Sequence, residues 1–229
     1  MNLEKLESDL IAIVNNGLMH LKSINHKGDN SIVTNCDVEI EKNIISYLEK
    51  HFSQIKIISE ENTESHQTFY SLNNRYAVVD PIDGTENFYF FKNIFGCAIS
   101  IVYDDINYHL IYLPSDNKKI SNISTPDFFD MESNINLMST SCIGQVEDTK
   151  NRQSTRILGS SSYMFYLLLS GSAKSYKYCG KAKVWDYFTG ISLALKSNLN
   201  LKITFGDMVI KSLPVDIPHK SNFLIESHE

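Results

Sequence analysis

The sequence is poor in several features that define simple protein classes. Glycine occurs 10 times and proline five times in 229 residues, which excludes collagen-like and low-complexity chains. Lys and Arg number 21 against 27 Asp and Glu, and the resulting net charge of −6 argues against a nucleic-acid-binding protein. The longest unbroken apolar run, 163–169, is far shorter than the roughly 20 residues that span a bilayer. We therefore expect neither nucleic acid nor a membrane as a partner.

Cysteine is also scarce, and its four positions are scattered without a C-x-x-C pair: Cys36, Cys97, Cys142 and Cys179. This spacing predicts neither a disulfide framework nor a zinc cluster. We expect four reduced thiols without a chemical role, as is usual in the cytosol. No basic segment precedes an apolar core near the N-terminus, so we expect no signal peptide and a cytoplasmic location.

The apolar fraction of 42% and the aromatic fraction of 11% are typical of a folded chain. Apolar residues at steps of three and four predict helices over 3–21, 37–48, 161–169 and 186–195. Apolar and alternating runs predict strands at 55–58, 76–79, 98–102, 108–113, 135–138, 175–178, 201–205, 208–210 and 223–225. The turn residues 104–107 predict a hairpin, and the polar stretch 115–133 predicts a boundary between lobes. We expect one compact unit with an α+β lobe over 1–133 and an α/β lobe over 134–229.

The most informative segment is Val79-Asp80-Pro81-Ile82-Asp83-Gly84-Thr85. Two carboxylates three residues apart follow a buried strand, and a helix beginning after Gly84-Thr85 would offer free N–H groups to an anion. Clustered carboxylate and carbonyl oxygens are the ligands that Mg²⁺ prefers. The alternative is an ordinary turn, because Asp-Pro and Asp-Gly are common turn dipeptides. A string this specific arises by chance with a probability on the order of 10⁻⁴, which favours the functional interpretation.

The run Asp80–Phe88 (DPIDGTENF) resembles the signature of the inositol monophosphatase-like, Mg²⁺-dependent, lithium-sensitive phosphatases. Further motifs follow the family order: V-T-x-x-D at 33–37, S-E-E at 59–61, G-S-S at 159–161 and W-D-x-x-x-G at 185–190. The resemblance extends from about residue 27 to residue 190. It implies a layered αβαβα sandwich with an antiparallel sheet in the first lobe, and a cytoplasmic enzyme that is commonly a homodimer.

The resemblance also implies a role for each motif. One Mg²⁺ would be held by Glu60, Asp80 and the Ile82 carbonyl, and a second by Asp80, Asp83 and Asp186. Two such ions about 3.5–4 Å apart clamp the attacking and leaving oxygens of an in-line phosphoryl displacement. Thr85 and Asp37 would orient and deprotonate a water, because a threonine hydroxyl alone is too weak a base. Gly84 and Thr85 N–H groups would hold the substrate phosphate, and Glu61 would support the cluster or bind a third ion.

Several of these residues have plainer interpretations when they are taken alone. Asp37 and Asp186 are also typical helix N-caps, and Glu60-Glu61 could be a solvated surface pair. Their order around the DPIDGT string is what favours the catalytic interpretation. The aromatic run 88–91 with Phe95 is better explained by core or dimer packing than by a binding platform. The seven histidines occur at no ligand spacing and receive no role.

The substrate is less well defined than the metal site. Family members that hydrolyse inositol phosphates carry an acid shortly before W-D, whereas the stretch 178–184 contains none. The spacing from Tyr176 through Gly180 to Trp185 instead resembles that of 3′(2′),5′-bisphosphate nucleotidases, although other residues of their pattern are missing. Candidate substrate contacts are Gly159, Ser160, Lys181 and Lys183, and the two lysines are equally typical of exposed surface.

We therefore expect a phosphomonoesterase acting on a small phosphorylated metabolite, a polyol or sugar phosphate. A bisphosphate nucleotidase is the alternative enzyme. A regulatory binding protein that keeps the phosphatase fold is the alternative from another class.

Overall fold

The computed structural model describes residues 1–19, 23–26, 31–62, 66–71, 74–125, 133–145 and 154–227. The polar turn residues expected at 27–30, the end of the first predicted helix at 20–21 and much of the predicted lobe boundary (126–132) lie outside these ranges. None of the described helices is long and apolar enough to cross a membrane.

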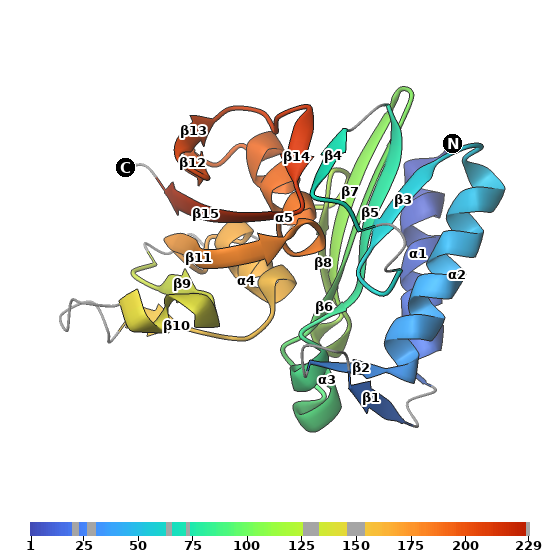
Figure 1. Ribbon diagram of the computed structural model, residues 1–229, viewed down its shortest axis with the longest axis horizontal. Helices are drawn as coiled ribbons and strands as arrows, with labels where there is room; N and C mark the ends of the chain where they lie inside the picture. Colours follow the sequence, from blue (N-terminus) through green and yellow to red (C-terminus); the bar gives the residue numbers. More distant parts are fainter. Residues whose placement is uncertain are drawn as a thin grey trace.

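A five-stranded sheet of order β3-β5-β6-β7-β8 forms the centre of the first half of the chain (Figure 1). Its strands are β3 (Lys56–Ser59), β5 (Arg75–Asp83), β6 (Gly96–Tyr103), β7 (Ile106–Leu113) and β8 (Lys118–Ser121). Only β3 and β5 are parallel; the other pairs are antiparallel, and β6 and β7 form the predicted hairpin. The mostly antiparallel first sheet agrees with the sequence expectation.

The second half of the chain forms a six-stranded sheet of order β10-β9-β11-β15-β12-β13. These strands are β9 (Asn136–Met138), β10 (Thr155–Arg156), β11 (Ser175–Lys183), β12 (Leu201–Phe205), β13 (Met208–Ile210) and β15 (Lys220–Ser227). Two small ribbons complete the strands: β1 (Ile24–His26) with β2 (Ile32–Thr34), and β4 (Phe69–Ser71) with β14 (Asp216–Pro218). Because the second ribbon joins the two halves, the division near residue 133 stays a prediction.

Helices cover one face of the first sheet and fill the space between the two sheets (Figure 1). The outer pair is α1 (Leu3–Leu18) and α2 (Asn35–His51), and the inner pair is α4 (Ser161–Leu169) and α5 (Val184–Lys196). Short helical segments are α3 (Thr85–Phe91), η2 (Pro114–Asp116) and η3 (Thr140–Gln145). The described elements thus stack as α, β, α and β, so the expected layered α+β sandwich is confirmed, whereas the outer helix layer of the expected αβαβα order is not found among the described residues.

Strand β5 shows why the sandwich forms around it. Its residues from Tyr76 onward are buried, because helices cover both faces of the sheet. Ala77 and Val79 pack against α1 and α2, whereas Tyr76 and Val78 face the core that contains α4 and α5. The alternation of side chains along a strand therefore divides one apolar run between two cores.

The segment after Val79 differs from the predicted turn. β5 continues to Asp83, and its register with β6 shifts between Asp80 and Asp83. This irregularity is a bulge, which bends the strand and re-aims its side chains. Pro81 is tolerated there because a bulge interrupts the ladder hydrogen bonds that a proline cannot donate.

Two predicted N-caps are wrong in detail. Asp37 and Asp186 each lie three residues inside the helix, at its third position, and α2 and α5 are preceded by Thr34 and Lys183. Each aspartate instead accepts a hydrogen bond from the backbone N–H of the residue before the helix, at 2.8 Å in both cases. This is the reciprocal half of a capping box, and it fixes each carboxylate close to the helix N-terminus.

The cysteine prediction is wrong for two of the four residues. Cys142 in η3 and Cys179 in β11 form a disulfide across 37 residues of sequence, with their Cα atoms 5.0 Å apart. Cys36 and Cys97 are free and buried, as expected. The pairing was hidden because nothing in the sequence spacing brings η3 against the middle of β11.

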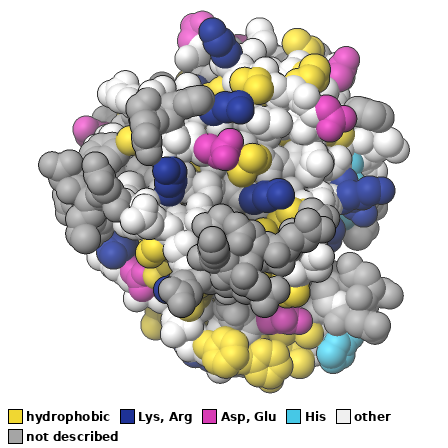
Figure 2. Space-filling view, turned by 90° about the vertical axis from the view of Figure 1, so that its left-hand side faces the viewer, with side chains coloured by type: hydrophobic (Ala, Val, Ile, Leu, Met, Phe, Trp, Pro, Cys, Tyr) yellow, Lys and Arg dark blue, Asp and Glu magenta, His cyan; other side chains and the backbone are white. Residues whose placement is uncertain are grey.

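The aromatic run behaves in two ways. Phe88 and Phe95 are buried, with ring centroids 4.9 Å apart, which agrees with core packing. Phe90 and Phe91 are 64% and 67% exposed, so core packing is the wrong interpretation for this pair, and their packing in a dimer stays a prediction. Figure 2 shows a large apolar patch at the lower edge of the molecule, the end at which α3 lies in Figure 1.

Candidate active site

Three carboxylates from both halves of the chain meet at one point. Asp80 and Asp83 come from the bulged end of β5, and Asp186 comes from the first turn of α5. One oxygen from each side chain lies within 4.8 Å of the others. The structure thus brings together the three residues that the sequence predicted as ligands of the second ion. Like charges this close are unfavourable unless protons or a cation neutralise them.

Asp80 is the most unusual member of this cluster. It is 1% exposed, and both of its carboxylate oxygens lack a hydrogen-bond partner among the described residues. Burial, followed by the charge of Glu60, raises its pKa well above the usual value. A buried carboxylate without donors is costly, and a bound divalent cation is a partner that removes this cost. The donor set therefore fits a hard, oxygen-liganded cation such as Mg²⁺.

The other two aspartates are held in place by the chain. Asp83 Oδ2 accepts hydrogen bonds from Ser160 Oγ, at 2.8 Å, and from the backbone N–H of Ser162. Burial raises the pKa of Asp83, and these hydrogen bonds oppose the rise. Asp186 is half-buried at the edge of a cavity, and burial and the Asp83 charge raise its pKa to about 8.

A second group lies beside the cluster and contains the predicted dyad. Thr85 Oγ1 is 3.1 Å from Asp37 Oδ1 and 3.1 Å from the Ile82 carbonyl oxygen, and it is the donor to both. Asp37 Oδ2 accepts from Thr34 Oγ1 at 2.5 Å and from Thr34 N. Burial raises the pKa of Asp37, while the bonds from Thr34 lower it. Asp37 and Thr85 therefore form a connected pair, with Ile82 beside them.

The predicted phosphate cradle coincides with the start of α3. Gly84 precedes this helix with φ of 88°, in the left-handed region that favours glycine. A Cβ at this position would lie 2.9 Å from the Ser160 Cβ and 3.2 Å from the Gly159 carbonyl oxygen. The first helical hydrogen bond runs from Phe88 N to the Gly84 carbonyl oxygen, so the amides of Thr85 and Glu86 precede the helical pattern.

The two glutamates of the S-E-E motif lie at the end of β3. Glu60 is close enough for its charge to raise the pKa of both Asp80 and Asp186. The backbone N–H of Glu61 donates to Glu41 Oε2 of α2 at 2.9 Å. Both glutamates are half-buried, which disagrees with the alternative of a fully solvated pair.

A cavity of about 120 Å³ opens beside Asp83 and Asp186. Two of the four candidate substrate contacts, Gly159 and Ser160, line it, whereas Lys181 and Lys183 do not. Lys181 is exposed, and the Lys183 ammonium lies 5.4 Å from the centroid of the Trp185 ring.

Other lining residues had no sequence signal that pointed to the site: Ser139, Thr140, Met164 and Tyr178. Ser162, whose amide holds Asp83, was also missed. Its place at the N-terminus of α4, directly after the G-S-S motif, is a usable signal because the first amides of a helix attract anions.

Comparison with known proteins gives matches for both the sequence and the fold. The model of the Inositol monophosphatase family matches residues 3–108, just under half of the chain. Inositol monophosphatase 1 of Solanum lycopersicum is 36% identical over 76 residues, and Nus factor SuhB of Escherichia coli K12 is 40% identical over 75 residues. Each match covers 33% of this chain but only 28% and 26% of the respective relative.

The fold match is much more extensive. A solved IMPase/NADP phosphatase in complex with NADP and Ca²⁺ superposes with a TM-score of 0.76 over 99% of this chain and 92% of the other, at 17% identity. The architecture is therefore that of the inositol monophosphatase fold. Together with the motifs, these matches support an inositol monophosphatase-like family for this chain.

Proposed function

We propose that this chain is a Mg²⁺-dependent phosphomonoester hydrolase that acts on a small polyol or sugar phosphate. The observation that carries the proposal is Asp80, a buried carboxylate without donors among the described residues, in reach of Asp83 and Asp186. The family match and the fold support the same class of activity.

The ligand set that we propose has two parts. One ion would be held by Glu60, Asp80 and the Ile82 carbonyl. A second ion would be held by Asp80, Asp83 and Asp186. Glu61 would support this cluster or bind a third ion. When bound, such ions polarise phosphoryl oxygens and lower the pKa of a water molecule to about 7. The hydrogen bonds from Ser160 and Ser162 aim the Asp83 carboxylate and oppose the rise in its pKa, because such bonds favour the charged form.

The remaining chemistry belongs to Thr85 and Asp37. A water that donates to Thr85 Oγ1 loses a proton as the threonine proton moves to Asp37 Oδ1, 3.1 Å away. The buried position of Asp37 raises its pKa and makes it a better acceptor. The amides of Gly84 and Thr85 at the start of α3 would orient the phosphate, and the alcohol part would occupy the cavity lined by Gly159 and Ser160.

The decisive test is phosphate release from inositol 1-phosphate with and without Mg²⁺, in wild type and in Asp83→Asn. We expect Mg²⁺-dependent release in wild type and a loss of at least roughly 100-fold in the variant, because an essential ligand is removed. Asp104→Asn is the matched control, since Asp104 lies at the exposed β6–β7 turn with φ of 50°, which asparagine tolerates. Release that persists in EDTA would contradict the proposal.

A bisphosphate nucleotidase is the second candidate, favoured by the Tyr176–Gly180–Trp185 spacing and by the absence of an acid in 178–184. Turnover of adenosine 3′,5′-bisphosphate and of NADP should be compared with that of inositol 1-phosphate under the same conditions. A regulatory binding protein that keeps the phosphatase fold is the candidate from another class, and one relative is named a Nus factor. It would be supported if wild type and Asp83→Asn retain the same macromolecular partner in a pull-down.

A further inference from the structure

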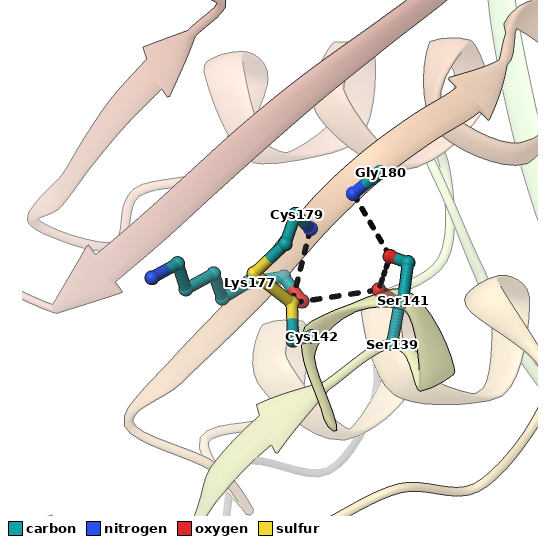
Figure 3. The surroundings of a disulfide bond; sticks show 6 residues. All are labelled: Ser139, Ser141, Cys142, Lys177, Cys179 and Gly180. Carbon is teal, nitrogen blue, oxygen red and sulfur yellow. Dashed lines mark hydrogen bonds between the residues drawn. A yellow bond between two sulfur atoms is a disulfide. The ribbon is translucent and has the colours of Figure 1, made fainter. Parts of the chain in front are cut away.

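The disulfide lies beside the candidate active site. Figure 3 shows Cys142 of η3 bonded to Cys179 in the middle of β11. Ser139 and Thr140 lie three and two residues before Cys142 and line the cavity beside Asp83 and Asp186, and Tyr178 lines it from β11. Each sulfur is thus attached to a segment that forms the wall of the cavity.

Around the disulfide, η3 packs directly against β11. Gly180 N donates to Ser141 Oγ at 2.8 Å (Figure 3). Ser139 N donates to the Lys177 carbonyl oxygen at 3.0 Å. A Cβ at Gly180 would lie only 2.7 Å from the Ser141 Cβ. Glycine is therefore required at this crossing, and the covalent link reinforces the contact that these hydrogen bonds make.

The two sulfurs differ in access and in environment. Cys142 is 0% exposed, whereas the Cys179 residue is half-buried, so Cys179 is the half of the pair at which we expect an external thiolate to attack. Attack there expels Cys142 as the leaving thiolate, and the Cys179 N–H, 3.0 Å from Cys142 Sγ, stabilises the charge that develops. The other two cysteines are buried and free, so the same reagent has no target there.

We propose that Cys142–Cys179 is a reversible thiol-exchange site that sets the rigidity of the wall contacting the alcohol part of the substrate. A dithiol supplies two electrons: its first thiolate forms a mixed disulfide with Cys179 and releases Cys142, which takes up a proton. Its second thiolate then attacks the mixed disulfide and releases Cys179, leaving two protein thiols and one oxidised dithiol. The effect on substrate binding rests on the proposed function, whereas the exchange itself does not.

The exchange is tested on the native 229-residue chain with dithiothreitol, followed by alkylation and peptide mass spectrometry. We expect Cys142 and Cys179 to be labelled together after reduction, and Cys36 and Cys97 to be labelled only in denaturant. Hydrogen exchange at the Gly180 and Ser139 amides should speed up in the reduced form. A pair that resists the dithiol in the native state, or that is already free in untreated protein, would overturn the proposal whether or not the chain is a phosphatase.

The consequence for binding is tested by kinetics with inositol 1-phosphate. We expect reduction to raise KM by roughly tenfold while kcat changes by less than about twofold, because positioning groups move and the reacting groups do not. The Mg²⁺ concentration for half-maximal rate should stay unchanged. The double variant Cys142→Ser/Cys179→Ser should show the same raised KM as the reduced wild-type chain, and the dithiol should not change it further.

Two kinetic outcomes would contradict this part of the proposal. One is a reducible disulfide with no change in KM, which identifies a structural crosslink only. The other is an equal effect of the dithiol on wild type and on the double variant, which places the effect elsewhere. If the double variant does not fold, Cys179→Ser takes its place, because it too has no disulfide for the dithiol to reduce. Absence of all phosphatase activity would instead refute the proposed function and leave the labelling result standing.

Discussion

At the scale of single residues, burial decides the chemistry of the ionisable groups. Asp80 is left without donors in a core position, and Asp37 is equally buried but receives three hydrogen bonds. The difference matches the roles proposed for them, since an acid without donors invites a cation and a well-bonded acid keeps its orientation. His109 shows the same principle outside the site.

His109 makes stability depend on pH. It is 2% exposed, its Nδ1 lies 2.8 Å from Ser100 Oγ, and burial followed by the charge of Lys196 lowers its pKa to about 3. The unfolded chain therefore binds a proton between pH 6.5 and 3 that the folded chain does not bind. The contribution is neutral above pH 6.5 and becomes destabilising as the pH falls, reaching about 2 kcal/mol near pH 5.

Urea unfolding of wild type and His109→Gln between pH 5 and 7.5 checks this expectation. The variant should lose less stability than wild type on acidification, because glutamine does not titrate. His51→Gln, at an exposed position, serves as control and should follow the wild-type slope. Parallel slopes for wild type and His109→Gln would contradict the assignment.

At the scale of elements, helix N-termini are aimed at the acids. α4 begins beside Asp83, α3 begins directly after it, and α2 and α5 contain Asp37 and Asp186 in their first turns. Four helix starts thus surround a cluster of negative charge, and their positive dipole ends partly offset its repulsion. Ser160 connects one of these helices to the acids directly, because it caps α4 and also donates a hydrogen bond to Asp83.

Ser160→Ala should therefore have two effects. Loss of the cap costs about 1 kcal/mol of unfolding free energy. Loss of the donor to Asp83 should also raise the Mg²⁺ concentration needed for half-maximal phosphate release, because the carboxylate becomes harder to ionise.

Asn2→Ala is the matched control. Asn2 also caps a helix, because it accepts hydrogen bonds from Glu4 N and Lys5 N at the start of α1, but it is distant in sequence from Asp83. It should lower stability by a similar amount and leave the Mg²⁺ dependence unchanged. An equal shift in both variants would show that Ser160 acts through stability alone.

At the scale of the whole molecule, the site joins the two sheets. β5 belongs to the first sheet, while α5 packs between the sheets and leads into the second. A cation bound by Asp80, Asp83 and Asp186 would therefore link the two halves and stabilise the folded chain as a unit. Trp185, the only tryptophan, is 1% exposed and adjacent to Asp186, so its fluorescence reports unfolding at this junction.

Removal of divalent cations should lower the urea concentration at which half of the wild-type protein is unfolded, as followed by Trp185 fluorescence. At a hundredfold excess over its Kd, Mg²⁺ is expected to add about 2.7 kcal/mol to the free energy of unfolding. Asp80→Asn should behave in the opposite way: without cations it should exceed wild type by about 0.5–2 kcal/mol, because a repelled buried charge is gone. It should also gain nothing from Mg²⁺. A variant less stable than wild type in EDTA would contradict this account.

Local patterns were enough to predict much of the molecule. The first helix (predicted over 3–21, observed over 3–18), the helix over 161–169, the β6–β7 hairpin and the layered sandwich follow from apolar spacing, turn chemistry or the resemblance. A helix is expected to begin after Gly84-Thr85, and it begins one residue earlier, at Thr85. The acids of the site could also be predicted, because their motifs are contiguous and ordered. Local signals of this kind depend on residues that are neighbours in the sequence, so they can be read from the sequence without the fold.

Only the tertiary structure decided the remainder, because it depends on residues that are distant in sequence and meet in space. The bulge that continues β5 through Pro81 depends on its register with β6, and the exposure of Phe90 and Phe91 depends on what packs around α3. The bond between Cys142 and Cys179 depends on η3 crossing β11 at Gly180. By itself, the sequence therefore determined which carboxylates could bind a cation, whereas the fold decided that Asp80, Asp83 and Asp186 converge and which wall encloses them.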